Sequence, residues 1–219
     1  GRELAAEHDA DVDIHIDETD DPYWHTLELL IDAVERHGWG GRTSAAHCCA
    51  MAAWDDDYAA RQIARAAEIG VNVITNPATN LFIQGRDDPE PKRRGIARVK
   101  ELLAAGVNVA AGQDNLYDGF YPLGSGDQMM IAWLLVHAAH LSTPEEIQLA
   151  IDSVGASAAR LLRIDDYAVE PGARADLVVF DAESYEDALR LQSPRRWVIH
   201  DGRVVAETSC EQQILRSEG

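Results

Sequence analysis

Cysteine and lysine are scarce in this sequence, and long apolar runs are missing. The three cysteines, Cys48, Cys49 and Cys210, form neither a CxxC pair nor an even set that could build a disulfide framework. Their pattern indicates a reducing compartment and predicts that Cys48 and Cys49 are buried small residues. No apolar stretch approaches the roughly 18 residues that a membrane-spanning helix needs. Since the polar N-terminal residues are also unlike a signal peptide, we expect a cytoplasmic protein with no membrane partner.

Positive charge is also in short supply. The chain has 19 Lys and Arg residues against 38 Asp and Glu residues, which gives a net charge of -19. Such a surface repels a phosphate backbone, so nucleic acid is excluded as a partner. The 219 residues, 46% of them apolar, are enough for one domain or for a large and a small one.

Short apolar strands alternate with amphipathic helices over most of the chain. Strands are predicted at 12–17, 42–47, 71–76 and 107–112. Helices are predicted at 22–37, 58–69, 96–105, 127–141, 144–154 and 156–162, with a long polar connection from Pro77 to Gly95. This alternation is typical of a parallel α/β sheet. Polar residues at successive strand ends favour a barrel, in which those ends meet on one face, over a doubly wound sheet.

The sequence pattern changes near the C-terminus, where turns and short strands replace the alternation of strands and helices. The segment Gly172–Asp181 reads as a turn and a strand, and 197–205 reads as a hairpin with a turn at Asp201-Gly202. We therefore predict two parts, residues 1–167 as barrel and 168–219 as a small β-domain.

Three of the four predicted strands end on a side chain that can bind a metal or carry a proton. His15, Asp17 and Glu18 close the first strand, His47 the second, and Asp114 follows the fourth. Each signal alone is more typical of a solvated strand end than of a site. Together they fit a hydrolytic metal site, which needs imidazole and carboxylate ligands and a further carboxylate to move protons.

In that interpretation each residue has a role. His15 and Asp114 are metal ligands, Glu18 is the proton carrier, and His47 orients the attacking water or polarises the substrate. Asp17 is left with a structural or supporting part. The catalytic candidates are therefore Glu18, His47 and Asp114, and the metal candidates are His15 and Asp114.

Several motifs in order resemble cytosine deaminase of the amidohydrolase superfamily. They are His15-Ile16-Asp17-Glu18, His47, Asn76-Pro77, Gln84-Gly85-Arg86, Pro91-Lys92-Arg93-Arg94-Gly95, Gly112-Gln113-Asp114-Asn115 and Tyr121-Pro122-Leu123-Gly124. The resemblance covers nearly the whole chain and aligns it with the second half of such an enzyme.

The resemblance implies a (β/α)8 TIM barrel, of which this chain would supply strands five to eight, with a small β-domain. A free half-barrel would leave two apolar edge strands unpaired, so we expect an N-terminal half, supplied by upstream residues or, as the alternative, by a partner chain. That half would carry a His-x-His metal pair and a substrate-binding glutamine. The implied cofactor is one divalent metal, zinc or iron, and the implied partner is a small heterocyclic substrate. We also expect a homo-oligomer.

Two departures from the family pattern leave the substrate open. Bacterial cytosine deaminases carry His-Asp-Asp where this chain has Gln113-Asp114-Asn115, and tryptophan where it has Phe120. We therefore predict Asn115 and Phe120 to be substrate-binding. The expected activity is hydrolytic deamination of cytosine or a related cyclic amidine. The alternatives are hydrolysis of another ring C–N bond, as in isocytosine, creatinine or N-isopropylammelide, and a non-catalytic subunit with the same fold.

Overall fold

A computed structural model describes residues 2–211 and 213 of the chain. The chain divides into two compact units, the first ending at Asp165 and the second beginning at Asp166. The first unit contains a parallel sheet with helices, and the second contains a small antiparallel sheet.

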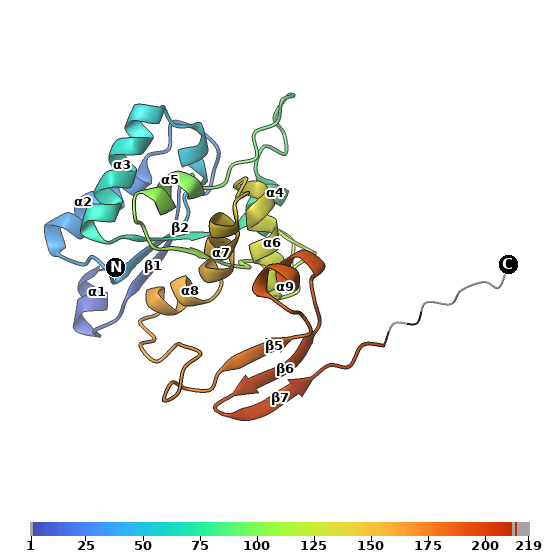
Figure 1. The fold of residues 1–219 in the computed structure, drawn as a ribbon. Helices are drawn as coiled ribbons and strands as arrows, with labels where there is room; N and C mark the ends of the chain where they lie inside the picture. The colour runs from blue at the N-terminus through green and yellow to red at the C-terminus, as the bar shows by residue number, and fades with distance from the viewer. Residues whose placement is uncertain (1, 212, 214–219) are drawn as a thin grey trace. The chain divides into compact units, whose positions relative to one another are not determined.

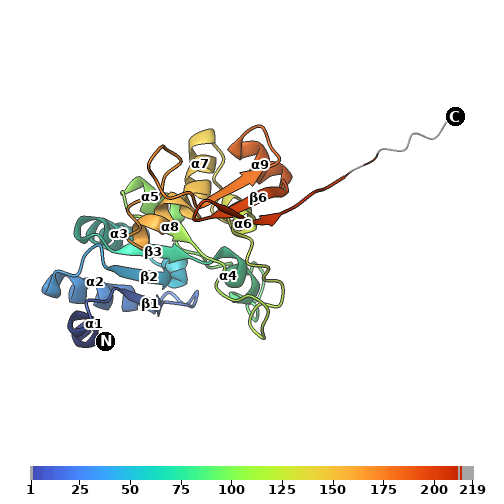
Figure 2. The same cartoon turned by 90° about the horizontal axis from the view of Figure 1, so that it is seen from below.

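The parallel sheet of the first unit has its strands in sequence order (Figures 1 and 2). The strands are β1 Val12–Ile16, β2 Thr43–His47, β3 Asn72–Thr75 and β4 Val109–Ala111. The register pairs Ile16 with His47 and Thr75 with Ala111, so the carboxyl ends of the strands share one edge. The predicted α/β class is confirmed. The described residues supply four parallel strands, so closure into an eight-stranded barrel stays a prediction.

Helices link successive strands and continue after β4. They are α1 Arg2–Glu7, α2 Thr26–His37, the 3-10 helix η1 Cys49–Ala53, α3 Asp56–Ile69, α4 Pro77–Ile83, α5 Val99–Ala104, α6 Gln128–Ala138, α7 Pro144–Ser153 and α8 Ala156–Leu161. Helix α3 contacts both α2 and α5, and the three follow one another beside the sheet in Figure 1. This succession is expected when each parallel strand returns through a helix.

Apolar side chains between this sheet and its helices form the core. Leu27 and Ile31 of α2, Val73 of β3, Leu102 of α5 and Leu135 of α6 are almost completely buried. Burying a side chain of this kind contributes about 1.5–3 kcal/mol to folding. The edge of the sheet that carries the polar strand ends is therefore held on a rigid support.

The two adjacent cysteines are buried, as predicted. Burial raises the pKa of the Cys48 and Cys49 thiols above the ordinary value. Both thiols therefore remain protonated at neutral pH and are poor nucleophiles and metal ligands.

Helix α3 shows how local sequence sets the boundaries of an element. The Asp55 side chain accepts hydrogen bonds from the backbone N–H groups of Asp57 and Tyr58, which starts the helix two residues before the predicted Tyr58. Gly70, with φ +76°, ends it where predicted. The Cα of Gly40 lies so close to this helix end that an added Cβ would stand 1.8 Å from the Ile69 carbonyl oxygen.

The predicted start of α2 at Pro22 is wrong, because the helix begins at Thr26. The reason is a cap supplied by a distant residue. The Asp17 carboxylate, just after β1, accepts hydrogen bonds from the backbone N–H groups of Thr26, at 2.8 Å, and Leu27, at 3.0 Å. Apolar spacing along the sequence does not reveal such a cap.

The predicted loop from Pro77 to Gly95 is also wrong in its first part, which forms helix α4. Proline is tolerated in the first turn of a helix, where its missing N–H group has no intrahelical partner. Ala78, Thr79 and Asn80 are buried despite the polarity of two of them. The sequence predicts a loop here because the whole connection is long, polar and rich in turn-forming residues.

The second unit contains the predicted C-terminal β-structure. Its antiparallel strands are β5 Leu177–Phe180, β6 Arg195–His200 and β7 Arg203–Glu207. Asp201 and Gly202 both have positive φ, which confirms the predicted tight turn between β6 and β7. Helix α9, Tyr185–Leu191, was not predicted; it begins where the Ser184 side chain accepts a hydrogen bond from the Asp187 N–H.

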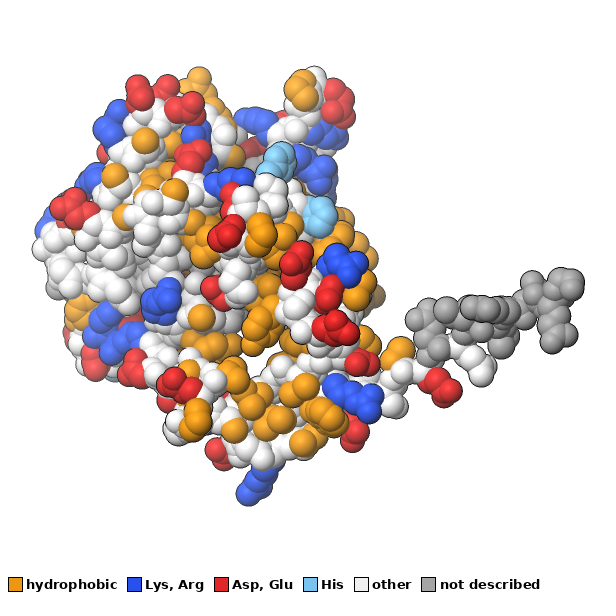
Figure 3. Space-filling model, viewed as in Figure 1, with side chains coloured by type: hydrophobic (Ala, Val, Ile, Leu, Met, Phe, Trp, Pro, Cys, Tyr) orange, Lys and Arg blue, Asp and Glu red, His pale blue; other side chains and the backbone are white. Residues whose placement is uncertain are grey.

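Charged side chains of both signs are interspersed over the face shown in Figure 3. Among the described residues, no helix is long and apolar enough to cross a membrane.

Candidate metal and proton-transfer site

The end of β1 places two candidate residues on either side of a sharp turn. Asp17 has φ +49° and its carboxylate is tied to the start of α2. His15 lies before this turn and Glu18 after it. The structural role predicted for Asp17 is therefore confirmed, and this residue fixes the position from which Glu18 extends.

The end of β2 contains the most buried candidate. His47 has no exposed surface. His47 and the following Cys48 have φ of +73° and +51°, a left-handed conformation that non-glycine residues seldom adopt. Two consecutive residues of this kind turn the chain abruptly at the sheet edge. Such strain is most common at functional sites.

The end of β4 has the same feature. Asp114 follows this strand with φ +61°, and its neighbour Gln113 is buried. Gln113 donates a hydrogen bond to the Asn115 carbonyl oxygen at 3.1 Å and accepts one from the Gly126 N–H at 3.3 Å. These two bonds fasten the loop that follows β4 and hold Asp114 beside the other strand ends.

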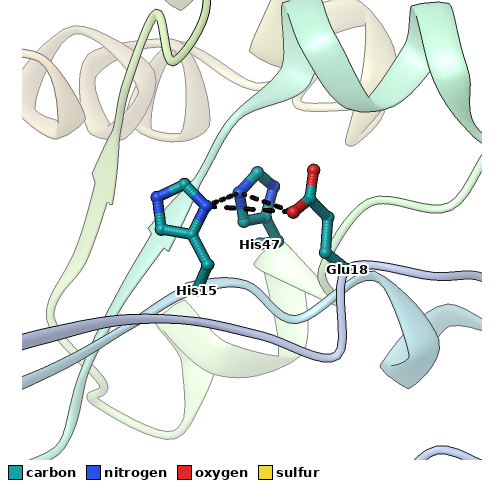
Figure 4. Close-up of side chains that lie close together, drawn as sticks. All are labelled: His15, Glu18 and His47. Carbon is teal, nitrogen blue, oxygen red and sulfur yellow. Dashed lines mark hydrogen bonds and ion pairs between the residues drawn. The ribbon is translucent and has the colours of Figure 1, made fainter. Parts of the chain in front are cut away.

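The four predicted residues come together (Figure 4 shows three of them). His47 Nε2 lies 2.9 Å from His15 Nδ1, 3.6 Å from Glu18 Oε2 and 3.9 Å from Asp114 Oδ2. His15 Nδ1 lies 3.8 Å from Glu18 Oε2. Residues separated by up to about 100 positions in sequence therefore share one small volume at the carboxyl edge of the sheet.

The electrostatics of this cluster keep one imidazole neutral. Burial lowers the pKa of His47 below its ordinary value, and the nearby His15 acts in the same direction. The carboxylates of Glu18 and Asp114 oppose this shift, but burial is the largest effect. A neutral His47 can donate through one ring nitrogen and accept through the other at neutral pH.

The donor chemistry of the cluster fits a divalent metal ion. One ligand atom each from His15, Glu18 and His47 can be chosen so that all three lie within 4.8 Å of one another. Imidazole nitrogen and carboxylate oxygen are suitable ligands for zinc and for iron. The distribution of roles, with His15 and Asp114 as ligands, stays a prediction.

Sequence reasoning missed the contribution of α4 to this site. The Asn80 side chain lies behind His47, with its Nδ2 atom 2.9 Å from His47 Nδ1. The Asn76 Nδ2 atom lies 3.4 Å from His47 Nε2 and 3.5 Å from His47 Nδ1. The signal in the sequence is the Asn76-Pro77 pair directly after a buried strand, which can start a helix. The residues from Pro77 onward are predicted as a loop instead.

The two predicted substrate-binding residues lie on the loop after β4. The Asn115 amide accepts a hydrogen bond from Thr79 Oγ1 at 3.3 Å and donates one to Asp118 Oδ2 at 2.7 Å. Asn115 thus connects α4 to the loop. Phe120 is 67% exposed. Their contact with a substrate stays a prediction.

An apolar cavity of the first unit lies elsewhere. A groove of about 550 Å³ runs along β1 between α1 and α2, and Ile14, Leu30 and Trp39 are among its lining residues. None of the four clustered residues lines it. The chemistry of the site therefore belongs to the polar sheet edge and not to this groove.

Comparison with known proteins agrees with the resemblance noted in the sequence. A family model described as the amidohydrolase family matches residues 3–206. A pterin deaminase of Rhizobium rhizogenes is 35% identical over 203 residues, which are 92% of this chain and 46% of that protein.

Two solved structures are also similar. A 5-methylcytosine deaminase of Klebsiella pneumoniae, crystallised with 5-fluorocytosine, has 35% identity and a TM-score of 0.92 over 97% of this chain and 52% of its own. An N-isopropylammelide isopropylaminohydrolase of Burkholderia multivorans has 27% identity and a TM-score of 0.80 over 94% and 50%. The chain spans about half the length of these relatives.

Proposed function

Because this chain belongs to the amidohydrolase family, we propose that it carries part of the active site of a hydrolytic deaminase. The enzyme would remove an exocyclic amine from a small nitrogen heterocycle. The single observation that carries the proposal is the convergence of His15, Glu18, His47 and Asp114, with His47 Nε2 between 2.9 and 3.9 Å from the other three.

The proposed cofactor is one divalent metal, zinc or iron. His15 and Asp114 would hold it, and a His-x-His pair from an earlier strand of the full protein would complete the ligand set, as the family resemblance implies. When bound, such an ion makes water acidic enough to act as a nucleophile near neutral pH.

The chain's own residues would then move the protons. In our proposal Glu18 takes a proton from the attacking water and passes it to the leaving amine. The C–O bond forms first and the C–N bond then breaks. The second hydrogen of the water ends on the adjacent ring nitrogen, so that the ring amine and one water give a ring carbonyl and ammonia. His47 is neutral because burial lowers its pKa, and it would orient the water or the substrate by a hydrogen bond.

The proposed substrate is cytosine or a closely related pyrimidine or cyclic amidine. The supporting observations are the 35% identity to the 5-methylcytosine deaminase and to the pterin deaminase. A second candidate is hydrolysis of an N-alkylated triazine. It is favoured by the likeness to the isopropylaminohydrolase and by Asn115, an amide where cytosine deaminases carry a carboxylate.

Ammonia or amine release by the full-length protein tests the proposal. Cytosine, 5-methylcytosine, isocytosine, pterin, creatinine and N-isopropylammelide should be assayed side by side, with and without a chelator. We expect ammonia release from a pyrimidine or pterin and its loss after metal removal. Turnover of N-isopropylammelide alone would favour the second candidate. A metal-free protein that is inactive on all six, even after addition of zinc or iron, would contradict the enzyme proposal.

A further inference from the structure

The side chain of Asn80 is placed where it controls the hydrogen on His47. Asn80 lies in α4 and is completely buried. Its Nδ2 atom is 2.9 Å from His47 Nδ1, a normal distance for an amide donor and an imidazole acceptor. A ring nitrogen that accepts a hydrogen bond carries no hydrogen itself, so a neutral His47 must carry its hydrogen on Nε2.

The other side of the ring points to the same tautomer. His47 Nε2 faces the carboxylate oxygens of Glu18 and Asp114 at 3.6 and 3.9 Å, and His15 Nδ1 at 2.9 Å. The Asn76 Nδ2 atom lies 3.4 Å from Nε2 and 3.5 Å from Nδ1, so this longer contact favours neither ring nitrogen. Carboxylate oxygens attract a hydrogen and repel a lone pair. A hydrogen on Nε2 is therefore attracted by the carboxylates of Glu18 and Asp114, and it can be donated to His15 Nδ1.

The oxygen of the Asn80 amide is a second sign that this side chain is present for its contact with His47. Asn80 Oδ1 is buried and has no hydrogen-bond partner among the residues that the structure describes. An unsatisfied buried carbonyl is unfavourable, and an asparagine whose only task was packing could be replaced by an apolar residue. Donation to His47 is the one described interaction that its buried amide makes.

From these contacts we propose that Asn80 is a positioning residue that fixes His47 in the tautomer with hydrogen on Nε2. Its importance for catalysis rests on the proposed function. His47 then presents a hydrogen-bond donor to the centre of the site and has no lone pair there. Although the position of His47 would allow it to bind a metal together with His15 and Glu18, this tautomer makes it a donor to water or substrate instead.

The test is a measurement of the two His47 ring nitrogens by ¹⁵N NMR in the metal-free, full-length protein. Spectra are taken at a pH where this ring is neutral, and a His47→Gln variant assigns the signals. We expect the Nδ1 signal of an acceptor and the Nε2 signal of a protonated nitrogen. A protonated Nδ1 with a bare Nε2 would overturn the proposal.

Two substitutions extend this test. Asn80→Asp replaces the donor by an acceptor of the same shape, so a hydrogen should appear on Nδ1. Thr79→Val is the matched control: Thr79 is buried in the same turn and bonds Asn115, not His47, so its ring signals should match those of the wild type. An Asn80→Asp protein with the wild-type pattern would contradict the proposal.

Activity is a separate readout. If the enzyme proposal holds, Asn80→Asp should lower kcat about 10- to 100-fold, the range seen when partners of active-site ligands are altered, with a smaller change for Thr79→Val. If the protein is inactive on every substrate, the proposed function fails while the NMR result still decides the role of Asn80.

Discussion

The two ends of the parallel sheet are built differently. At the amino end, polar groups are paired: Asn108 Nδ2 donates to Asn72 Oδ1 at 2.9 Å and Arg160 Nη1 donates to Asn108 Oδ1 at 2.7 Å. At the carboxyl end, His47 and Asp114 adopt left-handed backbone conformations, and the buried Asn80 Oδ1 atom has no hydrogen-bond partner within the described part of the chain.

This difference indicates that the amino end of the sheet contributes mainly to stability and the carboxyl end mainly to chemistry. An end with satisfied polar groups contributes to folding, whereas strain and unsatisfied groups persist where the surrounding structure holds them for function. Substitutions at the carboxyl end should therefore lower activity more than stability, and substitutions at the amino end should do the reverse.

The largest expected effect is at the carboxyl end. Asp114→Asn removes the charge but keeps a residue type that tolerates φ +61°. We expect metal affinity and turnover to fall by more than the about 10- to 100-fold typical of groups that only support a ligand. Metal titration and steady-state kinetics measure this. The unfolding free energy of the metal-free protein should change by less than about 0.5 kcal/mol. Unchanged metal binding would remove Asp114 from the ligand set.

The second effect is expected at the amino end. In Gly40→Ala the added Cβ would meet the Ile69 carbonyl oxygen at 1.8 Å, so the backbone must shift. We expect a loss of about 1–3 kcal/mol of stability, measured by denaturant unfolding, with kcat of the folded protein unchanged. Gly119→Ala is the control, because nothing lies within 4 Å of its added Cβ. Equal unfolding midpoints for the two variants would contradict this account of the amino end.

A smaller effect concerns acid sensitivity of the helices, away from both ends. Glu146 pairs with Lys100 and accepts hydrogen bonds from the Ser142 and Thr143 N–H groups at the start of α7, and these contacts lower its pKa to about 2. A lowered pKa stabilises the fold above the ordinary value of 4.5, and this stabilisation is lost as the pH falls toward about 2.

Unfolding measured from neutral pH to about pH 2 tests this assignment. Glu146→Gln keeps an oxygen for the helix cap but cannot titrate, so it should lose less stability than the wild type over the acid range. Parallel curves for the two proteins would show that Glu146 is not a source of acid sensitivity.

The residues of the candidate site could be predicted from the sequence more readily than the residues that hold them in place. His15, His47 and Asp114 could be found because parallel strands bring their carboxyl ends to one edge, which is a general property of the fold. The cap from Asp17 to α2 and the bond from Asn80 to His47 could not, because each joins positions 9 to 33 residues apart through a buried side chain. The polar residues of α4 predict a loop, because the sequence does not show that Thr79 and Asn80 are buried.

The central claim is that Glu18 carries protons at a metal site. Its most direct test is the turnover and metal content of Glu18→Gln in the full-length protein, with Glu68→Gln, an exposed position on α3, as the control. The account predicts a loss of about 10²- to 10⁴-fold in kcat for Glu18→Gln, with metal content equal to that of the wild type and no change for Glu68→Gln. Wild-type turnover by Glu18→Gln would contradict it.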